Sequence, residues 1–371
     1  RATEYQLLTS RVLISIDAMG GDHGPAVIVP GVQDYLRRSG DAGVSFLLHG
    51  DEAAISAEMS KAGLDGARVA VRHTDKVVGM DEKPAQAMRR GKGSSLWNAI
   101  ESVKSGEAGA VVSAGNTGAL MAIAKLQLRM AVPGLERPAI VASWPTLKGV
   151  TAVLDVGANI ESDAEQLVEF AIMGEAFHAA VHGGADGRPS IGILNVGSED
   201  MKGHEEVREA HQILRHGGLN LNYHGFVEGD DIARGTVDVI VTDGFTGNIA
   251  LKTAEGTARF ISTLLRDALT SGFQAKLGAA IAMPALKAMR QKIDPSTING
   301  GPLLGLNGIV VKSHGGADAR GFGNAIRIAT NLARSDYLDT VSASIGRLEA
   351  AVAASKTNKR GVGSGADGEP V

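Results

Sequence analysis

Two polar side chains draw attention because each follows a buried strand-like run at the start of an expected helix. Lys202 lies in the turn NVGSEDMKG (195–203), and Asn248 lies in DGFTGN (243–248). A cation at a helix start opposes the helix dipole, which favours an anionic ligand for Lys202 over a merely solvated side chain. Thr246 can cap the second helix, which leaves the Asn248 amide free for a ligand; capping by Asn248 itself is the alternative.

Six turns of this kind occur along the chain. Each joins an apolar run to a helical stretch through Gly, Asn or Asp: ISIDAMGGDHGP (14–25), VVSAGNTGA (111–119), VLDVGAN (153–159), ILNVGSEDMKG (193–203), VTDGFTGN (241–248) and VVKSHGGAD (310–318). In a parallel sheet such turns meet at the carboxyl edge, where helix N-termini attract anions. We therefore expect all six around one glycine-lined cleft for a phosphate-like group. Besides Lys202 and Asn248, the residues expected to bind there are Gly20, Gly21, Asp22, His23, Asn116, Thr117, Asp155, Asn159, Asp243, Thr246 and Gly247.

Strand-like runs alternate with helical stretches along the whole chain. Strands are expected at 11–17, 44–49, 68–72, 109–113, 139–143, 151–155, 190–194, 221–224, 237–242 and 308–312. Helices are expected at 25–38, 51–62, 83–91, 94–105, 117–131, 163–182, 204–216, 246–271, 318–334 and 337–354. This alternation predicts an α/β fold with parallel pairing and helices on both faces of the sheet. We assign residues 1–10 to an extension, 11–354 to the domain and 355–371 to a disordered tail.

The segment from Arg259 to Lys292 breaks the alternation, since it reads as two helices joined near Ser271–Gly272 with no strand between them. Phe273, Leu277 and Ile281 form one apolar stripe at helical spacing. The stripe packs either into the core or a dimer interface, or it is the tip of a projecting hairpin. A projecting hairpin would suit an acidic protein or an anionic membrane surface. Its basic residues are Arg259, Arg266, Lys276, Lys287, Arg290 and Lys292.

Composition and missing motifs narrow the chemistry. Aromatic residues are 4% and the net charge is −4, which disfavours nucleic acid as a partner. The absence of cysteine excludes disulfides and thiolate chemistry and fits a cytoplasmic protein. No Walker A loop, dinucleotide fingerprint or nucleophile elbow occurs, and we expect no organic cofactor. The spacing of Asp17, Asp22 and His23 fits no metal motif, and His178 with His182 lacks the glutamate of a zincin.

Several blocks together resemble one known family. The blocks are IDAMGGDHGP, SAGNTGALM, LDVGAN, ILNVGSEDMKG, NYHGFVEGDDI, VTDGFTGNIALK and GGPLLGLNGIVVKSHGGAD, and they span about residues 11–350. In this order they resemble the bacterial phosphate acyltransferases of phospholipid synthesis, the PlsX family. The resemblance implies a three-layer α/β/α fold with a mostly parallel sheet and a projecting helical hairpin. Phosphotransacetylases and isocitrate/isopropylmalate dehydrogenases share such a fold.

The resemblance also implies an activity. The family reversibly transfers a long-chain fatty acyl group from acyl carrier protein to inorganic phosphate. It acts as a homodimer at the membrane surface and hands acyl phosphate to a membrane-bound glycerol-3-phosphate acyltransferase. The family's catalytic lysine and asparagine fall on Lys202 and Asn248, and its basic hairpin falls on about 259–292. Carrier-protein or membrane contact is thereby implied for Arg259, Arg266, Phe273, Lys276, Leu277, Ile281, Lys287 and Arg290.

In this interpretation phosphate itself is the nucleophile. Lys202 orients the dianion, and Asn248 donates to the thioester oxygen in the tetrahedral state. Backbone N–H groups of 19–22, 115–118 and 157–159 complete the anion site. Three alternatives stay open: a phosphate acyltransferase that uses acyl-coenzyme A, a metal- and NAD-dependent decarboxylating dehydrogenase of similar fold, and a membrane-attached scaffold without activity.

Overall fold

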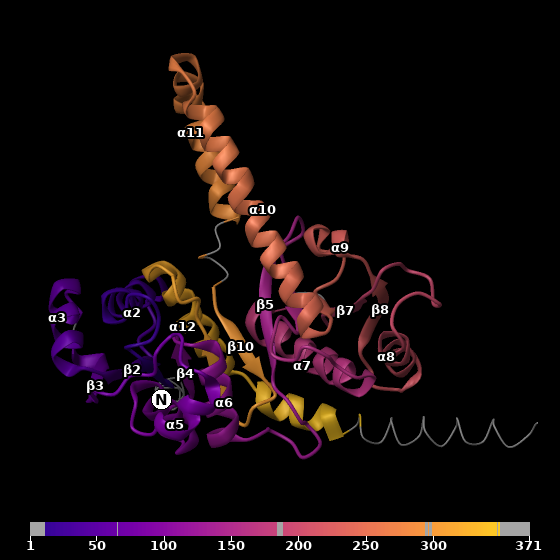
Figure 1. The fold of residues 1–371 in the computed structure, drawn as a ribbon, viewed down its shortest axis with the longest axis horizontal. Helices are drawn as coiled ribbons and strands as arrows, with labels where there is room; N and C mark the ends of the chain where they lie inside the picture. The colour runs from indigo at the N-terminus through magenta and orange to yellow at the C-terminus, as the bar shows by residue number, and fades with distance from the viewer. Residues whose placement is uncertain are drawn as a thin grey trace, which may run out of the picture.

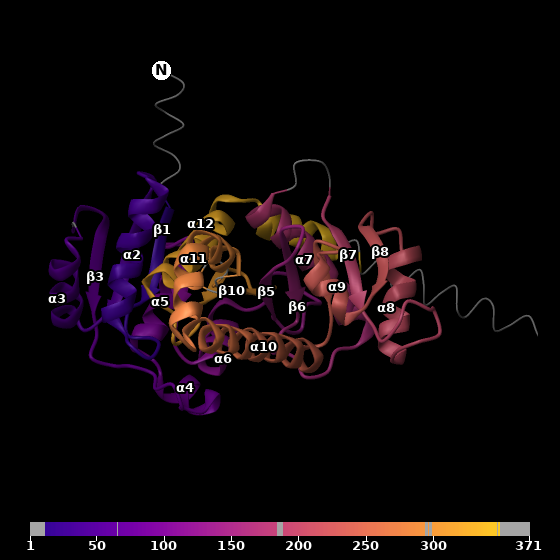
Figure 2. The same cartoon turned by 90° about the horizontal axis from the view of Figure 1, so that it is seen from above.

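A single mixed sheet runs through the molecule, from β3 at one end to β8 at the other (Figures 1 and 2). The computed structural model describes residues 12–64, 66–183, 188–293, 296, 299–346 and 348, so the predicted extension and tail lie outside the described residues. Within these ranges the strand order is β3-β2-β1-β4-β11-β10-β5-β6-β9-β7-β8. The strands are β1 (Val12–Asp17), β2 (Val44–Gly50), β3 (Val69–His73), β4 (Ala110–Ser113), β5 (Ala139–Pro145), β6 (Val150–Leu154), β7 (Ser190–Leu194), β8 (Asn222–Val227), β9 (Val239–Val241), β10 (Gly301–Leu304) and β11 (Ile309–Lys312).

Helices cover both faces of this sheet, in agreement with the near-continuous burial of its central strands. The helices are α2 (Pro25–Ser39), α3 (Glu52–Ala62), α4 (Pro84–Arg90), α5 (Ser95–Lys104), α6 (Thr117–Leu128), α7 (Ala164–His182), α8 (Glu205–His216), α9 (Gly229–Arg234), α10 (Gly244–Thr270), α11 (Phe273–Ile293) and α12 (Ala319–Arg334). Val112 and Val311 face the core formed with α2, α7 and α12. Their neighbours Val111 and Val310 face a second core with α5 and α6. The predicted three-layer α/β/α fold is therefore confirmed.

The sheet reverses direction in its middle. β10 pairs antiparallel with both β11 and β5, and β5 pairs antiparallel with β6. The strands β6, β9 and β7 are parallel to one another, as are β1, β4 and β11. The carboxyl ends of β6, β9 and β7 therefore lie at one edge of the sheet. Those of β1, β4 and β11 lie at the opposite edge. The expectation that all six turns meet at one edge is wrong, and they form two groups of three.

One strand in this middle region, β10, was not predicted. A single strand is expected here, at 308–312, but the chain forms two strands, β10 and β11, joined by a turn at 305–308. Gly305 and Gly308 both have positive φ there, of 89° and 153°, which glycine adopts at little cost. The short helix α9 was also not predicted. The last expected helix is present at 337–346, and the rest of it lies largely outside the described residues.

The helices α10 and α11 leave the body of the molecule as a hairpin (Figure 1). The 27 residues of α10 extend over about 40 Å at 1.5 Å per residue. Only Gly244 and Gly247 of α10 are buried. The stripe of Phe273, Leu277 and Ile281 is 84%, 56% and 77% exposed, so its placement in the core of this chain is wrong and the projecting hairpin is confirmed.

The predicted basic residues of the hairpin lie at its surface. Arg259, Arg266, Lys276 and Lys287 are all exposed. The side chains of Arg290 and Lys292 lie outside the described residues. Among the described helices, none has both the length and the apolar composition that crossing a membrane demands.

Candidate active site

The turns after β6, β9 and β7 lie side by side, because these strands are neighbours in the sheet. The N-terminus of α10 docks onto the turn after β6. The Gly244 amide donates to the Asn159 carbonyl at 2.7 Å. A Cβ placed on Gly247 would lie 1.9 Å from the carbonyl oxygen of Asp155, and one on Gly244 would lie 2.3 Å from that of Asn159. Both positions therefore require glycine, and Gly247 serves close packing of the helix against the turn.

Asp155 organises that turn from within. Its Oδ1 accepts hydrogen bonds from the amides of Ile140, Gly157 and Ala158 at 2.9, 3.2 and 3.1 Å. Its Oδ2 accepts from the backbone amide of Asn159 at 2.6 Å and from Asn159 Nδ2 at 3.0 Å. Burial raises the pKa of Asp155, but five N–H donors leave no acceptor for a carboxyl proton and favour the ionised form. Asp155 and Asn159 were predicted as ligand-binding residues; in the structure their side chains hold the turn, and the binding role stays a prediction.

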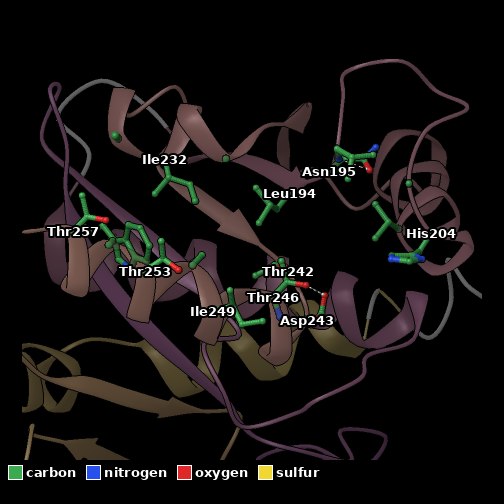
Figure 3. A pocket seen from close by; sticks show the side chains of 18 of the residues that line it. Leu194, Asn195, His204, Ile232, Thr242, Asp243, Thr246, Ile249, Thr253 and Thr257 are labelled. Atoms are coloured by element: carbon green, nitrogen blue, oxygen red, sulfur yellow. Dashed lines mark hydrogen bonds between the residues drawn. The ribbon is translucent and has the colours of Figure 1, made fainter.

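Asp243 caps α10. Its carboxylate accepts from the Thr246 amide at 2.8 Å and from the Thr246 hydroxyl at 2.7 Å (Figure 3). The prediction that Thr246 caps this helix is wrong, because the helix begins at Gly244, two residues earlier than expected. The Asn248 side chain is nevertheless exposed and makes no hydrogen bond within the described part of the chain. It faces Gly157: a Cβ placed on Gly157 would lie 3.5 Å from Asn248 Oδ1.

Lys202 lies in the turn after β7, on the other side of the α10 N-terminus. Its Nζ pairs with Glu199 Oε2 at 2.8 Å, and the Lys202 side chain is 50% exposed. The hydrogen bond from Lys202 to Glu199 raises the pKa of Lys202, so the side chain is a cation at neutral pH. Asn195 Nδ2 donates to the Lys202 carbonyl at 3.0 Å and fixes the loop. Lys202 and Asn248 thus flank one helix N-terminus, with no hydrogen bond joining them among the described residues.

The turns after β1, β4 and β11 form the second group, and they pack on one another. The Asp22 amide donates to the Gly315 carbonyl at 3.0 Å, and a Cβ on Gly20 would lie 2.7 Å from the Gly115 amide nitrogen. Asn116 caps α6 through the Ala119 amide at 3.0 Å. Its Nδ2 also donates to the carbonyls of Met80 and Glu82 at 2.9 and 2.8 Å. The Asn116 side chain therefore holds the start of α6 against the 79–82 loop. Gly20 and Gly21 pack closely against the two neighbouring turns. Thr117 is the first residue of α6, and the side chains of Asp22 and His23 are exposed.

Sequence reasoning missed a partly buried lysine in this second group. Lys312 ends β11, and its Nζ donates to the Ala114 carbonyl at 3.1 Å. Burial lowers its pKa to about 8, against the attraction of Asp17 and Asp22. Asp17 is buried and accepts from Ser113 Oγ at 2.7 Å. Among the described residues, no group of three or more histidines and acids is arranged to hold a metal ion. The signal available in sequence was a lysine directly after the apolar run IVV.

A cavity of about 970 Å³ lies beside α10 and the turn that carries Lys202 (Figure 3). Asn195, Gly203, His204, Asp243 and Thr246 line one part of it. The side chains of Leu194 and Ile232 face α10 across the cavity (Figure 3). Asn248 does not line it, since Asn248 points toward Gly157 on the other side of the helix.

Known proteins resemble this chain over nearly its whole length. A family described as "Fatty acid synthesis protein" matches residues 12–339. The phosphate acyltransferase of Caulobacter vibrioides is 66% identical over 364 residues, covering 98% of this chain and 99% of that protein. The phosphate acyltransferase of Phenylobacterium zucineum is 58% identical over 345 residues, covering 93% and 97%. A phosphotransacetylase structure from Streptococcus pyogenes has a TM-score of 0.59 at 18% identity, covering 90% and 97%, which supports the fold. The chain therefore belongs to the family of fatty acid synthesis proteins that includes these phosphate acyltransferases, and it is an acyltransferase.

Proposed function

We propose that this chain transfers a long-chain fatty acyl group from acyl carrier protein to inorganic phosphate, giving acyl phosphate for phospholipid synthesis. The observation that carries the proposal is the match to relatives named phosphate acyltransferase, 66% and 58% identical to this chain. The site is compatible with that chemistry. It combines a helix N-terminus, a cation at Lys202 and the exposed amide of Asn248, and all three attract a negatively charged reactant.

Phosphate attacks the thioester carbonyl directly in this proposal. An oxygen of the phosphate dianion forms the new bond to the carbonyl carbon, and the phosphopantetheine sulfur leaves as a thiolate. Lys202 exchanges its Glu199 partner for phosphate and orients it. Asn248 donates from its side-chain amide to the carbonyl oxygen as negative charge develops there. The absence of cysteine agrees with a route that needs no thiol nucleophile.

The hairpin provides the contact surface for partners in this proposal. Acyl carrier protein is acidic, so exposed Arg259, Arg266, Lys276 and Lys287 attract it in a salt-dependent manner. The exposed apolar stripe of Phe273, Leu277 and Ile281 associates with the membrane surface or with the partner subunit of a homodimer. Peripheral membrane association brings the product to the glycerol-3-phosphate acyltransferase that consumes it.

The test is a trapping assay with two acyl donors. Palmitoyl-acyl carrier protein and palmitoyl-coenzyme A are each mixed with protein and phosphate, and acyl phosphate is trapped with hydroxylamine. We expect product from the carrier-protein donor, and about a 100-fold or greater loss of turnover in Asn248→Ala and Lys202→Ala. Lys148→Ala, at an exposed lysine outside the site, is the control. Near-normal turnover of both variants at saturating phosphate would refute the residue assignment.

A second candidate differs only in its donor. The fold is shared with a phosphotransacetylase at a TM-score of 0.59, which keeps acyl-coenzyme A in consideration as the donor. Equal or higher kcat/KM with palmitoyl-coenzyme A in the same assay would favour that candidate.

A further inference from the structure

One face of α10 forms the wall of a long apolar groove that the proposed catalytic residues do not fill (Figure 3). The α10 side chains in this wall recur at spacings of three and four, so they share one side of the helix. They are Thr246, Ile249, Ala250, Thr253, Ala254, Thr257, Ala258 and Ile261. The facing wall is mainly apolar and comes from β5, β7, α8 and α9, through Trp144, Leu194, Val207, Ile232 and Ala233, together with Val196 of the turn after β7.

The groove begins at the loop that carries Lys202. Gly203 and Asn195 line that end. Gly203 follows Lys202 directly in the chain, and Asn195 Nδ2 donates a hydrogen bond to the Lys202 carbonyl at 3.0 Å. Asp243 and Thr246, at the N-terminus of α10, complete the polar end. From there the groove follows α10 to Ile261 and becomes apolar.

The length of the groove suits a fatty acyl chain. Asp243 and Ile261 both line it and are 18 residues apart, which is roughly 27 Å along a helix. An extended peptide advances about 3.5 Å over three backbone bonds, so an extended sixteen-carbon chain spans about 18 Å. The alanine and threonine side chains leave a channel instead of filling it, and the cavity volume of about 970 Å³ is ample for such a ligand.

We propose that this groove binds the acyl chain of the donor, with the thioester at the N-terminus of α10, which Lys202 and Asn248 flank, and the chain end directed toward Ile261. The inference rests on the proposed acyl transfer and adds the place of the acyl chain. Each methylene withdrawn from water there improves binding about fourfold. Ala250, Ala254 and Ala258 lie one after another along the groove, so their small size sets how long a chain can enter.

The experiment places a tryptophan at each of these depths. Ala250→Trp, Ala254→Trp and Ala258→Trp are separated by four residues each, or about 6 Å, which corresponds to about five carbons. We expect Ala254→Trp to lower kcat/KM for the sixteen-carbon carrier-protein donor at least tenfold, while that for a six-carbon donor changes less than threefold. Ala258→Trp should shorten the preferred chain less, and Ala250→Trp more. Gly256→Trp is the matched control, since a Cβ there meets open space outside the groove.

Two further readouts separate the possible outcomes. Displacement of the fluorescent fatty acid cis-parinaric acid by palmitate reports binding without catalysis and should weaken in Ala254→Trp and in the milder Ala254→Leu. Light scattering reports oligomeric mass. A changed mass with an unchanged chain-length profile would overturn the proposal, because a second copy would then cover the groove. An equal loss of kcat/KM for all chain lengths in variants with native circular dichroism would also overturn it.

Absence of acyl phosphate from wild-type protein with every donor would count against the proposed function, and palmitate displacement would still test the groove.

Discussion

Replacing Asp155 with asparagine tests whether this carboxylate is a structural centre or a ligand for substrate. The carbonyl oxygen of the new amide would keep the three acceptor bonds that Asp155 Oδ1 makes to backbone amides. At the second position an NH₂ group would face two donors, the backbone and side-chain N–H groups of Asn159. We therefore expect the turn after β6 to lose two hydrogen bonds and to gain a repulsive contact between donors.

The expected loss of stability follows from those two bonds. Hydrogen bonds to a charged acceptor contribute about 1.5–3 kcal/mol each, so their loss alone is about 3–6 kcal/mol. A neutral amide costs less to bury than a carboxylate, which offsets part of this. The net prediction is a decrease of about 3 kcal/mol in the free energy of unfolding, a large share of the roughly 5–15 kcal/mol typical of a protein.

Urea unfolding of Asp155→Asn measures this loss, with Asp163→Asn as the control. Asp163 is an exposed cap of α7 that accepts from the Gln166 amide at 2.8 Å, and asparagine caps a helix about as well as aspartate. Its variant should therefore change stability by less than about 1 kcal/mol. Activity of Asp155→Asn should fall together with its stability, because Gly157 in this turn faces Asn248. Wild-type stability combined with a 100-fold loss of turnover would instead assign Asp155 to the chemistry.

Three other outcomes are expected. Gly247→Ala should lower turnover at least tenfold, because the new Cβ would lie 1.9 Å from the Asp155 carbonyl oxygen. Gly256→Ala is the control and should leave turnover intact, because a Cβ there meets open space. Equal turnover of the two variants would contradict the docking of α10 on the turn after β6. Glu199→Gln should lower the KM for phosphate a few-fold, because Lys202 loses the carboxylate that competes with phosphate. An unchanged or higher KM for phosphate in initial-rate kinetics would contradict the binding of phosphate by Lys202. Burial raises the pKa of Glu169 to about 8, so between about pH 4.5 and pH 8 the folded state keeps a proton that the unfolded state releases. The stability that protonated Glu169 contributes is therefore fully present below about pH 4.5 and is lost as the pH rises through 8. Glu169→Gln should therefore match wild type near pH 5 and exceed it by on the order of 2–4 kcal/mol at pH 8 in denaturant unfolding, and a constant difference would contradict the burial argument.

The sequence was sufficient for the fold class because each parallel strand carries its own local signal. Val12–Asp17 is an apolar run followed by glycines and a helix, and the structure forms β1 and α2 there. The opposite directions of the two halves were not predicted, because they depend on β5, which runs in the same direction as β11 across β10 and pairs antiparallel with β6. Pairing partners are long-range properties that local periodicity does not encode.

The candidate site was predictable in part for a similar reason. A lysine that opposes a helix dipole is visible in sequence, and Lys202 is indeed exposed at a helix N-terminus. The role of Asp155 was not visible, because its five donors come from a turn and a neighbouring strand whose approach only the fold determines. Lys312 was missed because a lysine after an apolar run is usually solvated, and its partial burial becomes evident only from the packing of three turns.

The most direct test of the account asks which group attacks the thioester. The protein is incubated with palmitoyl-acyl carrier protein and ¹⁸O-labelled phosphate, and both the product and the intact protein are examined by mass spectrometry. Direct attack predicts palmitoyl phosphate that retains all the label of its phosphate, and protein that never gains the mass of a palmitoyl group, even when phosphate is withheld. A palmitoylated protein that forms without phosphate and releases its acyl group when phosphate is added would contradict the account.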